Sequence, residues 1–270
     1  MKIRAITGFF FIIVMLASVL LGHYVFGAFY LVLSGFCLWE FYGLIKKANI
    51  SPNVQTGLLN GLFIYTVFAL ITYQDTHDVH KLLFLLPVTM SAVFIQELFK
   101  KTGAPFTNIA YTLLGLVFTI IPFTFFHALA YVSGSFNFHY PMAFLLMLWA
   151  NDTGAYLTGR AFGKHKLFER HSPKKTWEGF VSGVLISAGA GAIISHYYTE
   201  LALQQWVSIA VLIGCFGTLG DLIESMFKRS IDVKDSGGIL PGHGGLLDRF
   251  DGLLLAAPIV YCYLYFITNA

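Results

Sequence analysis

The longest polar strip of the chain, KRSIDVKDSGGILPGHGGLLDRFDG, runs from Lys228 to Gly252 and carries residue types that could handle phosphate groups. It contains eight charged residues, six glycines and one histidine. Lysine and arginine attract phosphate oxygens, glycine lets the backbone come close to an anion, and carboxylates are ligands that suit Mg²⁺. Because apolar stretches flank the strip at 205–227 and 253–267, this chemistry would take place beside a membrane.

Acidic side chains near both ends of this strip could form a metal site. In the segment FGTLGDLIESMFKR, the residues Asp221, Ser225 and Lys228 would share one face of a helix. Asp248 and Asp251 would open the last helix, where the helix dipole alone favours acids, so either one singly is weak evidence. Together with Asp221 they form a cluster of hard oxygen donors that suits Mg²⁺.

The helix that carries Asp221 also has small residues at a regular spacing. Gly214, Gly217 and Gly220 follow one another at intervals of three, and Glu224 lies close to the acidic face. Small residues at helical spacing let a second membrane helix approach closely. We therefore expect another helix to pack against this one, beside the candidate metal site.

A second polar cluster, WANDTGAYLTGRAFGKHK at 149–166, begins inside an apolar window. Ionisable residues within a membrane are costly, and they are functional candidates by default. On a helix, Asp152, Tyr156 and Arg160 would form one stripe that climbs toward the end of the window. The stripe could bind substrate, or Asp152 and Arg160 could simply pair to hold helices together.

A third cluster, HSPKKTWEG at 171–179, precedes the next apolar window. Ser172 followed by Pro173 predicts a helix start, with serine as the N-cap and proline in the first helical position. Lys174 and Lys175 would then lie in the first turn, which is the wrong end of a helix for cations. Something anionic should offset that placement, either lipid headgroups or a phosphate-rich substrate.

The elements that must position these clusters are membrane-spanning helices. Hydrophobic residues make up 57% of the 270 residues and charged residues only 11%, whereas a soluble domain has about a quarter charged residues. A helix needs about twenty apolar residues to cross a membrane. We therefore predict an all-α integral membrane protein with about nine transmembrane helices, at 4–22, 24–45, 56–73, 82–99, 108–133, 140–159, 177–197, 204–227 and 250–268.

The positive charges indicate the orientation of these spans. With the N-terminus in the cytoplasm and the C-terminus outside, all 17 lysines and arginines except Lys81 lie on the cytoplasmic side. The sequence thus predicts a multi-pass protein of the cytoplasmic (inner) membrane. This arrangement already explains the net charge of +3, so no nucleic-acid partner is expected.

The two halves of the chain differ in their polar content. Residues 1–137 contain aliphatic and aromatic spans with no polar cluster, and they are expected to form a scaffold that could also provide dimer contacts. Residues 138–270 hold the three clusters and should form the active site. In the first half, Glu97 is spaced to form an ordinary surface ion pair with Lys100 or Lys101.

The combination of cations, carboxylates and glycines at one membrane face favours metal-assisted phosphoryl or nucleotidyl transfer. The GxxxxGK[ST] pattern is absent, so the chain is not a P-loop enzyme. A secondary transporter of an anionic solute is a weaker alternative. Such proteins carry charge at mid-bilayer and are built from inverted repeats, whereas here the charges crowd one face and no repeat is present.

The stretch SMFKRSIDVKDSGGILPGHGGLLDRFDG, residues 225–252, resembles the signature of the phosphatidate cytidylyltransferases, also called CDP-diacylglycerol synthases. The segments NDTGAYLTGRAFGKHK and SPKKTWEG resemble the same family, so the resemblance covers residues 149–252 strongly. The signature positions matched are Ser225, Lys228, Arg229, Lys234, Asp235, Pro241, His243, Gly244, Gly245, Asp248, Arg249 and Asp251.

The resemblance implies a specific reaction. A phosphate oxygen of phosphatidate attacks the α-phosphorus of CTP, which yields CDP-diacylglycerol and pyrophosphate. A phosphomonoester is already anionic near neutral pH, so no strong general base is required. The barrier is then the meeting of two anions, which cations and metal ions lower. A CTP-dependent lipid kinase would use similar substrates and remains the nearer alternative.

The resemblance also implies roles for individual residues. Asp221 and Asp248 would hold Mg²⁺, with a second cation possible nearby. Asp251 is the third candidate metal residue, and from its place one helical turn further along it could instead act on the helix dipole or beside the ligands in a milder role. A homodimer is favoured by the resemblance, and His243 is left open between phosphate binding, turn capping and no role. The residues expected to act in catalysis are Asp221, Lys228, Arg229, Asp248 and Arg249. Those expected to bind substrate are Asp152, Arg160, Lys164, Ser172, Lys174, Lys175, Thr176, Ser225, Lys234, Asp235, His243, Gly244 and Gly245.

Overall fold

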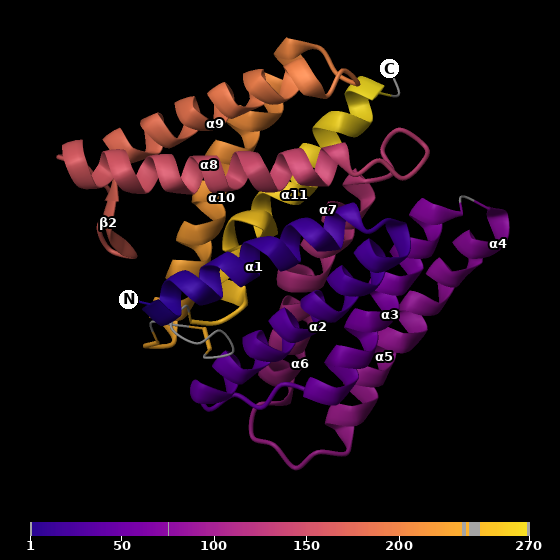
Figure 1. The fold of residues 1–270 in the computed structure, drawn as a ribbon. Helices are drawn as coiled ribbons and strands as arrows, with labels where there is room; N and C mark the ends of the chain where they lie inside the picture. Colours follow the sequence, from indigo (N-terminus) through magenta and orange to yellow (C-terminus); the bar gives the residue numbers. More distant parts are fainter. Residues whose placement is uncertain (1, 75, 234–235, 238–243, 269–270) are drawn as a thin grey trace.

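The computed structural model describes residues 2–74, 76–233, 236–237 and 244–268, and these are almost entirely helical (Figure 1). In chain order the elements are α1 (Lys2–Leu20), α2 (His23–Lys47), α3 (Val54–Tyr73), α4 (His77–His80), η1 (Lys81–Phe84), α5 (Leu85–Leu98), α6 (Pro105–Gly115), η2 (Leu116–Ile120), α7 (Ile121–Leu129), α8 (His139–Phe162), β1 (Lys166–Phe168), β2 (Ser172–Thr176), α9 (Trp177–Tyr197), α10 (Leu203–Ser230) and α11 (Leu247–Thr268).

Helices occupy all nine positions where the sequence predicts a span, with α4–η1–α5 and α6–η2–α7 each filling one of them. Within the described ranges, seven helices are long and apolar enough to cross a membrane. The polar helix α8 is not among them, and the apolar segment Thr7–Leu20 of α1 is shorter. The prediction of an all-α, multi-pass membrane protein is confirmed. The count of nine and the orientation of the termini stay predictions.

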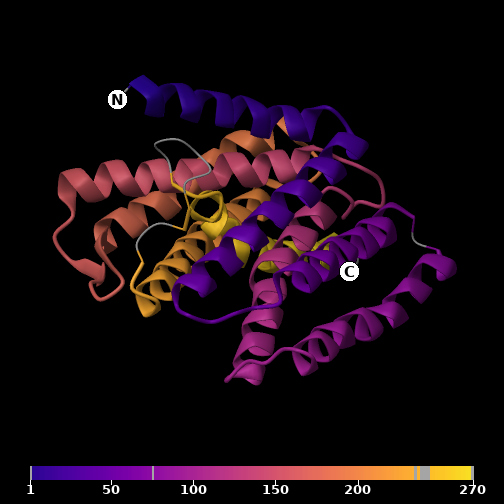
Figure 2. The same cartoon turned by 90° about the horizontal axis from the view of Figure 1, so that it is seen from below.

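The helices form two packed groups (Figures 1 and 2). Helices α8, α9, α10 and α11 pack on one another, while α2, α3, α5 and α6 lie together on the other side of the molecule. Helix α7 contacts both α3 and α11 and so joins the two groups. The N-terminus lies on the same side as the β1–β2 hairpin, and the C-terminal end of α11 lies on the opposite side.

The glycines of α10 are points of close helix contact, as predicted. A Cβ atom on Gly217 would meet the side chain of Leu148, and the backbone of Gly252 lies just beyond it. A Cβ on Gly220 would collide with the backbone carbonyl of Asp251. Because only glycine lets α10 and α11 approach this closely, these residues bring the acids of the two helices together.

The predicted helix start at Ser172 is wrong. Residues Ser172–Thr176 instead form strand β2, which pairs antiparallel with β1. The N-cap of α9 is Thr176, whose hydroxyl oxygen accepts a hydrogen bond of 3.2 Å from the backbone amide of Gly179. Threonine is a good N-cap, and pairing with β1 gives the preceding residues an extended partner, so the Ser172–Pro173 signal does not decide the boundary.

The hairpin removes the conflict between the paired lysines and the helix dipole. Lys174 and Lys175 lie in β2 and therefore outside the first turn of α9. The first turn contains Glu178, which is the charge that the dipole favours there. Its carboxylate also accepts hydrogen bonds of 3.1–3.2 Å from the backbone amides of Lys164 and His165, which fixes the turn between α8 and β1.

The expectation of a surface ion pair at Glu97 is also wrong. Lys100 does lie 3.4 Å from its carboxylate, but Glu97 itself is only 2% exposed. The carboxylate accepts hydrogen bonds from the side chains of Asn108 (2.6 Å) and Thr102 (2.8 Å). The N-terminal half thus contains a buried polar cluster, because hydrogen bonds to Oε1 and the ammonium of Lys100 near Oε2 lower the cost of removing this carboxylate from water.

Candidate active site

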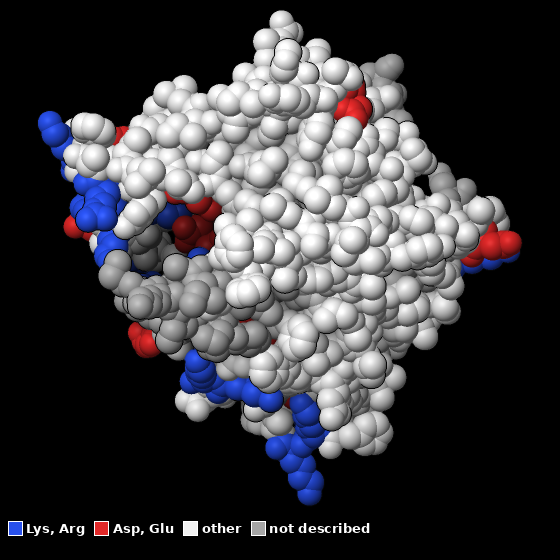
Figure 3. All heavy atoms as spheres, viewed as in Figure 1, with Lys and Arg blue, Asp and Glu red and all other residues white. Residues whose placement is uncertain are grey.

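A cavity of about 890 Å³ opens where the three polar clusters meet. Figure 3 shows acidic side chains deep in a hollow on the left of this view, with lysines and arginines around its rim. Elements from both ends of the chain form the walls. The charged and polar lining residues are Thr7, Asn151, Asp152, Thr153, Tyr156, Arg160, Lys166, Lys174, Lys175, Thr176, Thr218, Asp221, Asp248, Arg249 and Asp251.

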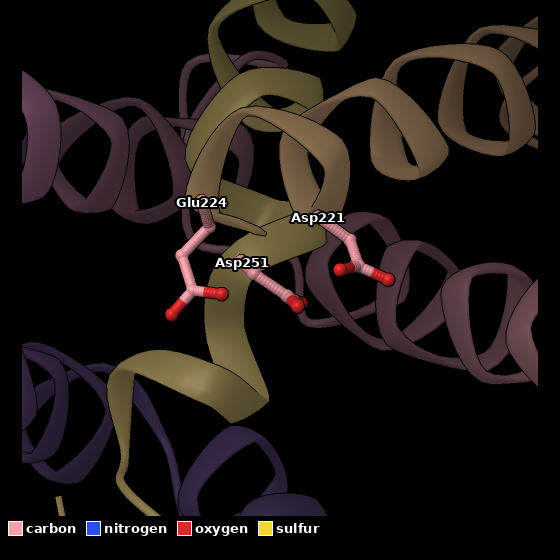
Figure 4. Close-up of side chains that lie close together, drawn as sticks. All are labelled: Asp221, Glu224 and Asp251. Carbon is pink, nitrogen blue, oxygen red and sulfur yellow. The ribbon is translucent and has the colours of Figure 1, made fainter. Parts of the chain in front are cut away.

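Three carboxylates gather where α10 and α11 touch. Oxygen atoms of Asp221, Glu224 and Asp251 all lie within 4.8 Å of one another. Asp221 and Glu224 are three residues apart on one face of α10, and Asp251 reaches them from the first turns of α11. In Figure 4 the Asp251 carboxylate lies between the other two. The close approach of the helices at Gly220 makes this grouping sterically feasible.

The grouped acids fit a divalent cation. Carboxylate oxygens are hard donors, and three of them converge at the wall of the cavity, where like charges repel unless a cation offsets them. The Glu224 side chain is fully buried, and its Oε1 atom has no hydrogen-bond partner among the described residues. A buried carboxylate oxygen without a partner is costly, so the chemistry of this donor set favours metal binding.

Asp248 lines the same cavity but is not a member of this group, and the expectation that it holds the metal with Asp221 stays a prediction. Its Oδ1 atom lies 2.7 Å from the ammonium of Lys228. Its carboxylate also accepts hydrogen bonds from the backbone amides of Ser236 (3.1–3.2 Å) and Gly245 (3.0 Å). Backbone amides thus engage Asp248 in addition to Lys228, and the carboxylates that lie closest to one another are those of Asp221, Glu224 and Asp251.

Lys228 links the acid group, defined as Asp221, Glu224 and Asp251, to Asp248 at the start of α11. Its ammonium forms ion pairs with both Glu224 and Asp248, and the residue is only 9% exposed. It does not line the cavity. This lysine therefore neutralises buried carboxylates, and its position differs from that of the cations on the cavity wall.

Lys175 reaches into the cavity from the hairpin. Its ammonium lies 2.6 Å from Asp221 and 3.4 Å from the carbonyl oxygen of Thr218 on α10. Lys174, Lys166 and Arg249 line the same cavity. The hairpin and the start of α11 thus place cations opposite the acid group, which is the arrangement that a ligand with several phosphates needs.

The predicted stripe on α8 faces the cavity. Asp152, Tyr156 and Arg160 are all lining residues. Asp152 accepts a hydrogen bond of 3.2 Å from the side chain of Asn151, and the structure records no ion pair between the described side chains of Asp152 and Arg160. This contradicts the alternative in which the two residues merely pair with each other.

The remaining predicted site residues fall into two sets. Among the described residues, some do not line the cavity: Lys164, Ser172, Ser225, Lys228, Arg229, Gly244 and Gly245. Ser225 still donates a hydrogen bond of 3.3 Å to Asp221, whereas Arg229 donates to the carbonyl of Val233. The others lie outside the described residues: Lys234, Asp235 and His243.

Sequence reasoning assigned no role to several residues that the structure brings to the site. Glu224 has a detectable signal, since it follows Asp221 by three residues on the same helical face. Lys166 lies in a quoted motif and lines the cavity. Thr7 and Phe11 of α1 also line it, and nothing in their local sequence distinguishes them from other residues of an apolar span.

The fold and the cavity define a multi-pass helical membrane protein whose charged site suits metal-assisted chemistry on phosphates. The sequence pattern of the Cytidylyltransferase family matches residues 2–267. The chain therefore belongs to the cytidylyltransferase family, and it is a nucleotidyltransferase.

Individual relatives agree with this assignment. A protein named phosphatidate cytidylyltransferase from Staphylococcus haemolyticus (strain JCSC1435) is 33% identical over 263 residues, which is 96% of this chain and 97% of the relative. Proteins of the same name from Staphylococcus saprophyticus and Staphylococcus aureus (strain COL) are 34% identical over 265 and 262 residues, again 96% of this chain and 97% of each relative. The similarity thus spans nearly the whole length of both partners.

Proposed function

We propose that this chain transfers the CMP moiety of CTP to phosphatidate, forming CDP-diacylglycerol and pyrophosphate. The observation that carries this proposal is the composition of the cavity. One part of its wall carries acids and cations, and another carries large apolar side chains: Phe11, Ile12, Trp149, Leu167 and Phe180. A substrate with a phosphate head and acyl chains requires both kinds of wall, and the names of the relatives point to the same substrate.

The cations of the cavity are proposed to bind the triphosphate of CTP. Lys174, Lys175, Arg160 and Arg249 line the same cavity as Asp221 and Asp251, and cations held in place lower the repulsion between two anionic substrates. Positioning the phosphate nucleophile in line with the α-phosphorus supplies the remaining rate enhancement. None of these steps requires a protein base, because the nucleophile is already ionised at neutral pH.

Asp221, Glu224 and Asp251 are proposed to hold Mg²⁺. A bound divalent cation supplies charge stabilisation at the phosphoryl oxygens. These acids would hold the ion opposite the cations of the cavity wall. Asp248, with Lys228, would support the backbone at Ser236 and Gly245. A second cation stays a prediction.

We place the cavity on the cytoplasmic side of the cytoplasmic membrane, where CTP is available, and we expect the chain to act as a homodimer. Residues 1–137 would form the scaffold and residues 138–270 the active-site half. The positive-inside rule supports this orientation, because the lysines and arginines gather at the cavity end, whereas Lys81 pairs with Asp78 elsewhere.

The product of the reaction tests the proposal directly. Purified protein is incubated with Mg²⁺ and vesicles that contain phosphatidate, in one reaction with CTP labelled at the α-phosphorus and in another with CTP labelled at the γ-phosphorus. Label from the α-position alone should appear in the lipid fraction. Transfer of γ-label to the lipid would instead identify a CTP-dependent lipid kinase, and label in neither reaction would reject both enzymes.

The orientation can be tested with single cysteines. His77→Cys places a thiol at the first residue of α4, and His165→Cys places one at the turn before β1, where His165 has a side-chain exposure of 79%. An impermeant thiol reagent should label residue 165 only from the cytoplasmic side and residue 77 only from outside. Labelling of both from one side would contradict the proposed topology.

The paired lysines of β2 provide a test of the CTP site. Replacing Lys174 and Lys175 by alanine should raise the KM for CTP by about tenfold or more, since a hydrogen bond to a charged group contributes about 1.5–3 kcal/mol. The matched control is Lys46→Ala with Lys47→Ala, a lysine pair at the end of α2 that does not line the cavity. Equal kinetics for the two double variants would show that β2 only anchors the protein to headgroups.

A further inference from the structure

The buried carboxylate of Glu40, in the N-terminal half, contacts the backbone at the start of α11. Glu40 lies in α2 and is only 4% exposed. Its Oε2 atom accepts a hydrogen bond of 2.9 Å from the backbone amide of Leu247, the first residue of α11, which is 207 positions away in sequence. The first amides of a helix have no partner within the helix, so this carboxylate satisfies one of them from a distant element.

The backbone of the strip also leaves space that the Glu40 side chain fills. A Cβ atom on Gly245 would lie 2.7 Å from Oε2 of Glu40, and a Cβ on Gly237 would collide with Oε1. Side chains essentially never come this close to a Cβ atom. The two glycines therefore leave the space in which the carboxylate of Glu40 lies, and a side chain at either position would displace that carboxylate.

The residues that Glu40 contacts are the ones that hold the acidic side chains in place. Gly245 donates a backbone hydrogen bond to Asp248, and Leu247 begins the helix whose first turns carry Asp248 and Asp251. A change in the entry angle of α11 would therefore move Asp251 relative to Asp221 on α10. The two helices touch at Gly220, so a small rotation there alters the spacing of the acid group.

We propose that Glu40 is a positioning residue of the active site. It fixes the start of α11 and the backbone at Gly237 and Gly245, so that Asp251 meets Asp221 and Glu224. It does not touch the cavity and acts only through the backbone that it binds. This inference rests on the proposed metal site, and it gives the N-terminal scaffold a direct part in the geometry of that site.

The test compares two substitutions at Glu40 with one at a similar residue elsewhere. Glu40→Gln keeps an oxygen that can accept the Leu247 hydrogen bond, whereas Glu40→Ala removes it. The control is Glu97→Ala, which removes another buried carboxylate of the N-terminal half whose side-chain partners, Asn108 and Thr102, do not line the cavity. Two readouts that need no turnover are used, Mn²⁺ affinity and hydrogen–deuterium exchange of the peptide that covers residues 244–250.

Glu40→Ala should weaken Mn²⁺ binding by about ten- to a hundredfold, the usual effect of losing a residue that orients ligands, and should speed exchange at residues 244–250. Glu40→Gln should restore most of both values. Glu97→Ala should lower the thermal stability without changing either value. Wild-type Mn²⁺ affinity in Glu40→Ala, or an equal loss in Glu97→Ala, would overturn the proposal. The exchange data separate this outcome from a failure of the proposed function, since they do not depend on the metal or on any activity.

Gly237→Ala keeps the proposal testable if Glu40→Ala does not fold. The added Cβ would displace the carboxylate of Glu40, although Glu40 itself is not substituted in this variant. We expect weaker Mn²⁺ binding and faster exchange at residues 244–250, as in Glu40→Ala. Gly43→Ala is the matched control, because it lies in the same helix as Glu40 and a Cβ there meets no atom within 4 Å. Unchanged Mn²⁺ binding in Gly237→Ala would contradict the positioning role.

Discussion

Asp221→Asn and Asp251→Asn should each lower the rate of CDP-diacylglycerol formation by about a thousandfold, which corresponds to about 4 kcal/mol of lost transition-state stabilisation. Both residues belong to the group of carboxylates within 4.8 Å of one another. Asparagine preserves the size of the side chain and removes the charge that attracts Mg²⁺. The loss should accompany a weaker Mn²⁺ affinity in each variant, with little rescue by excess metal.

Asp248→Asn should have a smaller effect than either of these changes. Its carboxylate is engaged by Lys228 at 2.7 Å and by the amides of Ser236 and Gly245, and an asparagine oxygen can still accept part of these hydrogen bonds. The resemblance alone implies the reverse order, with Asp248 in the metal site and Asp251 in a milder role. The ranking of Asp248→Asn against Asp251→Asn therefore decides between the two assignments.

The control for these measurements is Asp78→Asn, an exposed acid that pairs with Lys81 outside the cavity. It should retain wild-type turnover and Mn²⁺ affinity. Each variant must also elute like the wild type in gel filtration with detergent, so that misfolding is not mistaken for loss of the metal. Near-normal turnover in well-folded Asp221→Asn and Asp251→Asn would refute the metal assignment.

Much of the fold could be predicted from the sequence because hydropathy determines where membrane helices lie. Windows of apolar residues located the helices, and the spacing of Gly217 and Gly220 predicted that another helix packs closely against α10, which the structure shows to be α11. The face shared by Asp221 and Ser225 followed from the helical period, and the hydrogen bond between them agrees with it. These features depend on residues that are near one another in the chain.

The rest of the site depends on contacts between distant residues. The carboxylate of Glu40 becomes a helix cap only when α11 is placed beside α2, and Glu97 is buried only because Asn108 and Thr102 come to it. The spacing of Glu97 and Lys100 is the same for a surface ion pair and for a buried one, so the local sequence does not distinguish the two. One further prediction was wrong because the local pattern left an alternative open: strand pairing with β1 overrode the helix signal at Ser172. The backbone donors of Asp248 also come from residues that the local pattern of α11 does not indicate, and its metal role stays a prediction.

Lys228→Met should destabilise the folded protein by about 3–5 kcal/mol, the usual cost of breaking a buried ion pair by removing one partner. The Lys228 ammonium is the cation that pairs with Glu224, which is fully buried, and with Asp248. Methionine has a similar apolar stem and no charge, so the substitution leaves two buried carboxylates without their counterion. Thermal unfolding in detergent should show the loss as a lower midpoint.

The neighbouring cation provides the control for this change. Arg229 is exposed, and its side chain donates a hydrogen bond to the carbonyl of Val233. Arg229→Met should therefore change stability by no more than about 0.5 kcal/mol, as is usual for surface substitutions. A similar midpoint in the two variants would show that Lys228 does not stabilise the buried acids.

A compensating substitution separates the structural role of Lys228 from catalysis. Glu224→Gln removes one of the two charges that Lys228→Met leaves unpaired, so the double variant should recover part of the lost stability, as expected for residues that share one ion-pair network. Turnover should not recover with it, because Glu224 belongs to the acid group and Asp248 still lacks its ammonium partner. Recovery of turnover together with stability would mean that neither Lys228 nor Glu224 contributes to the chemistry beyond holding α10 and α11 together.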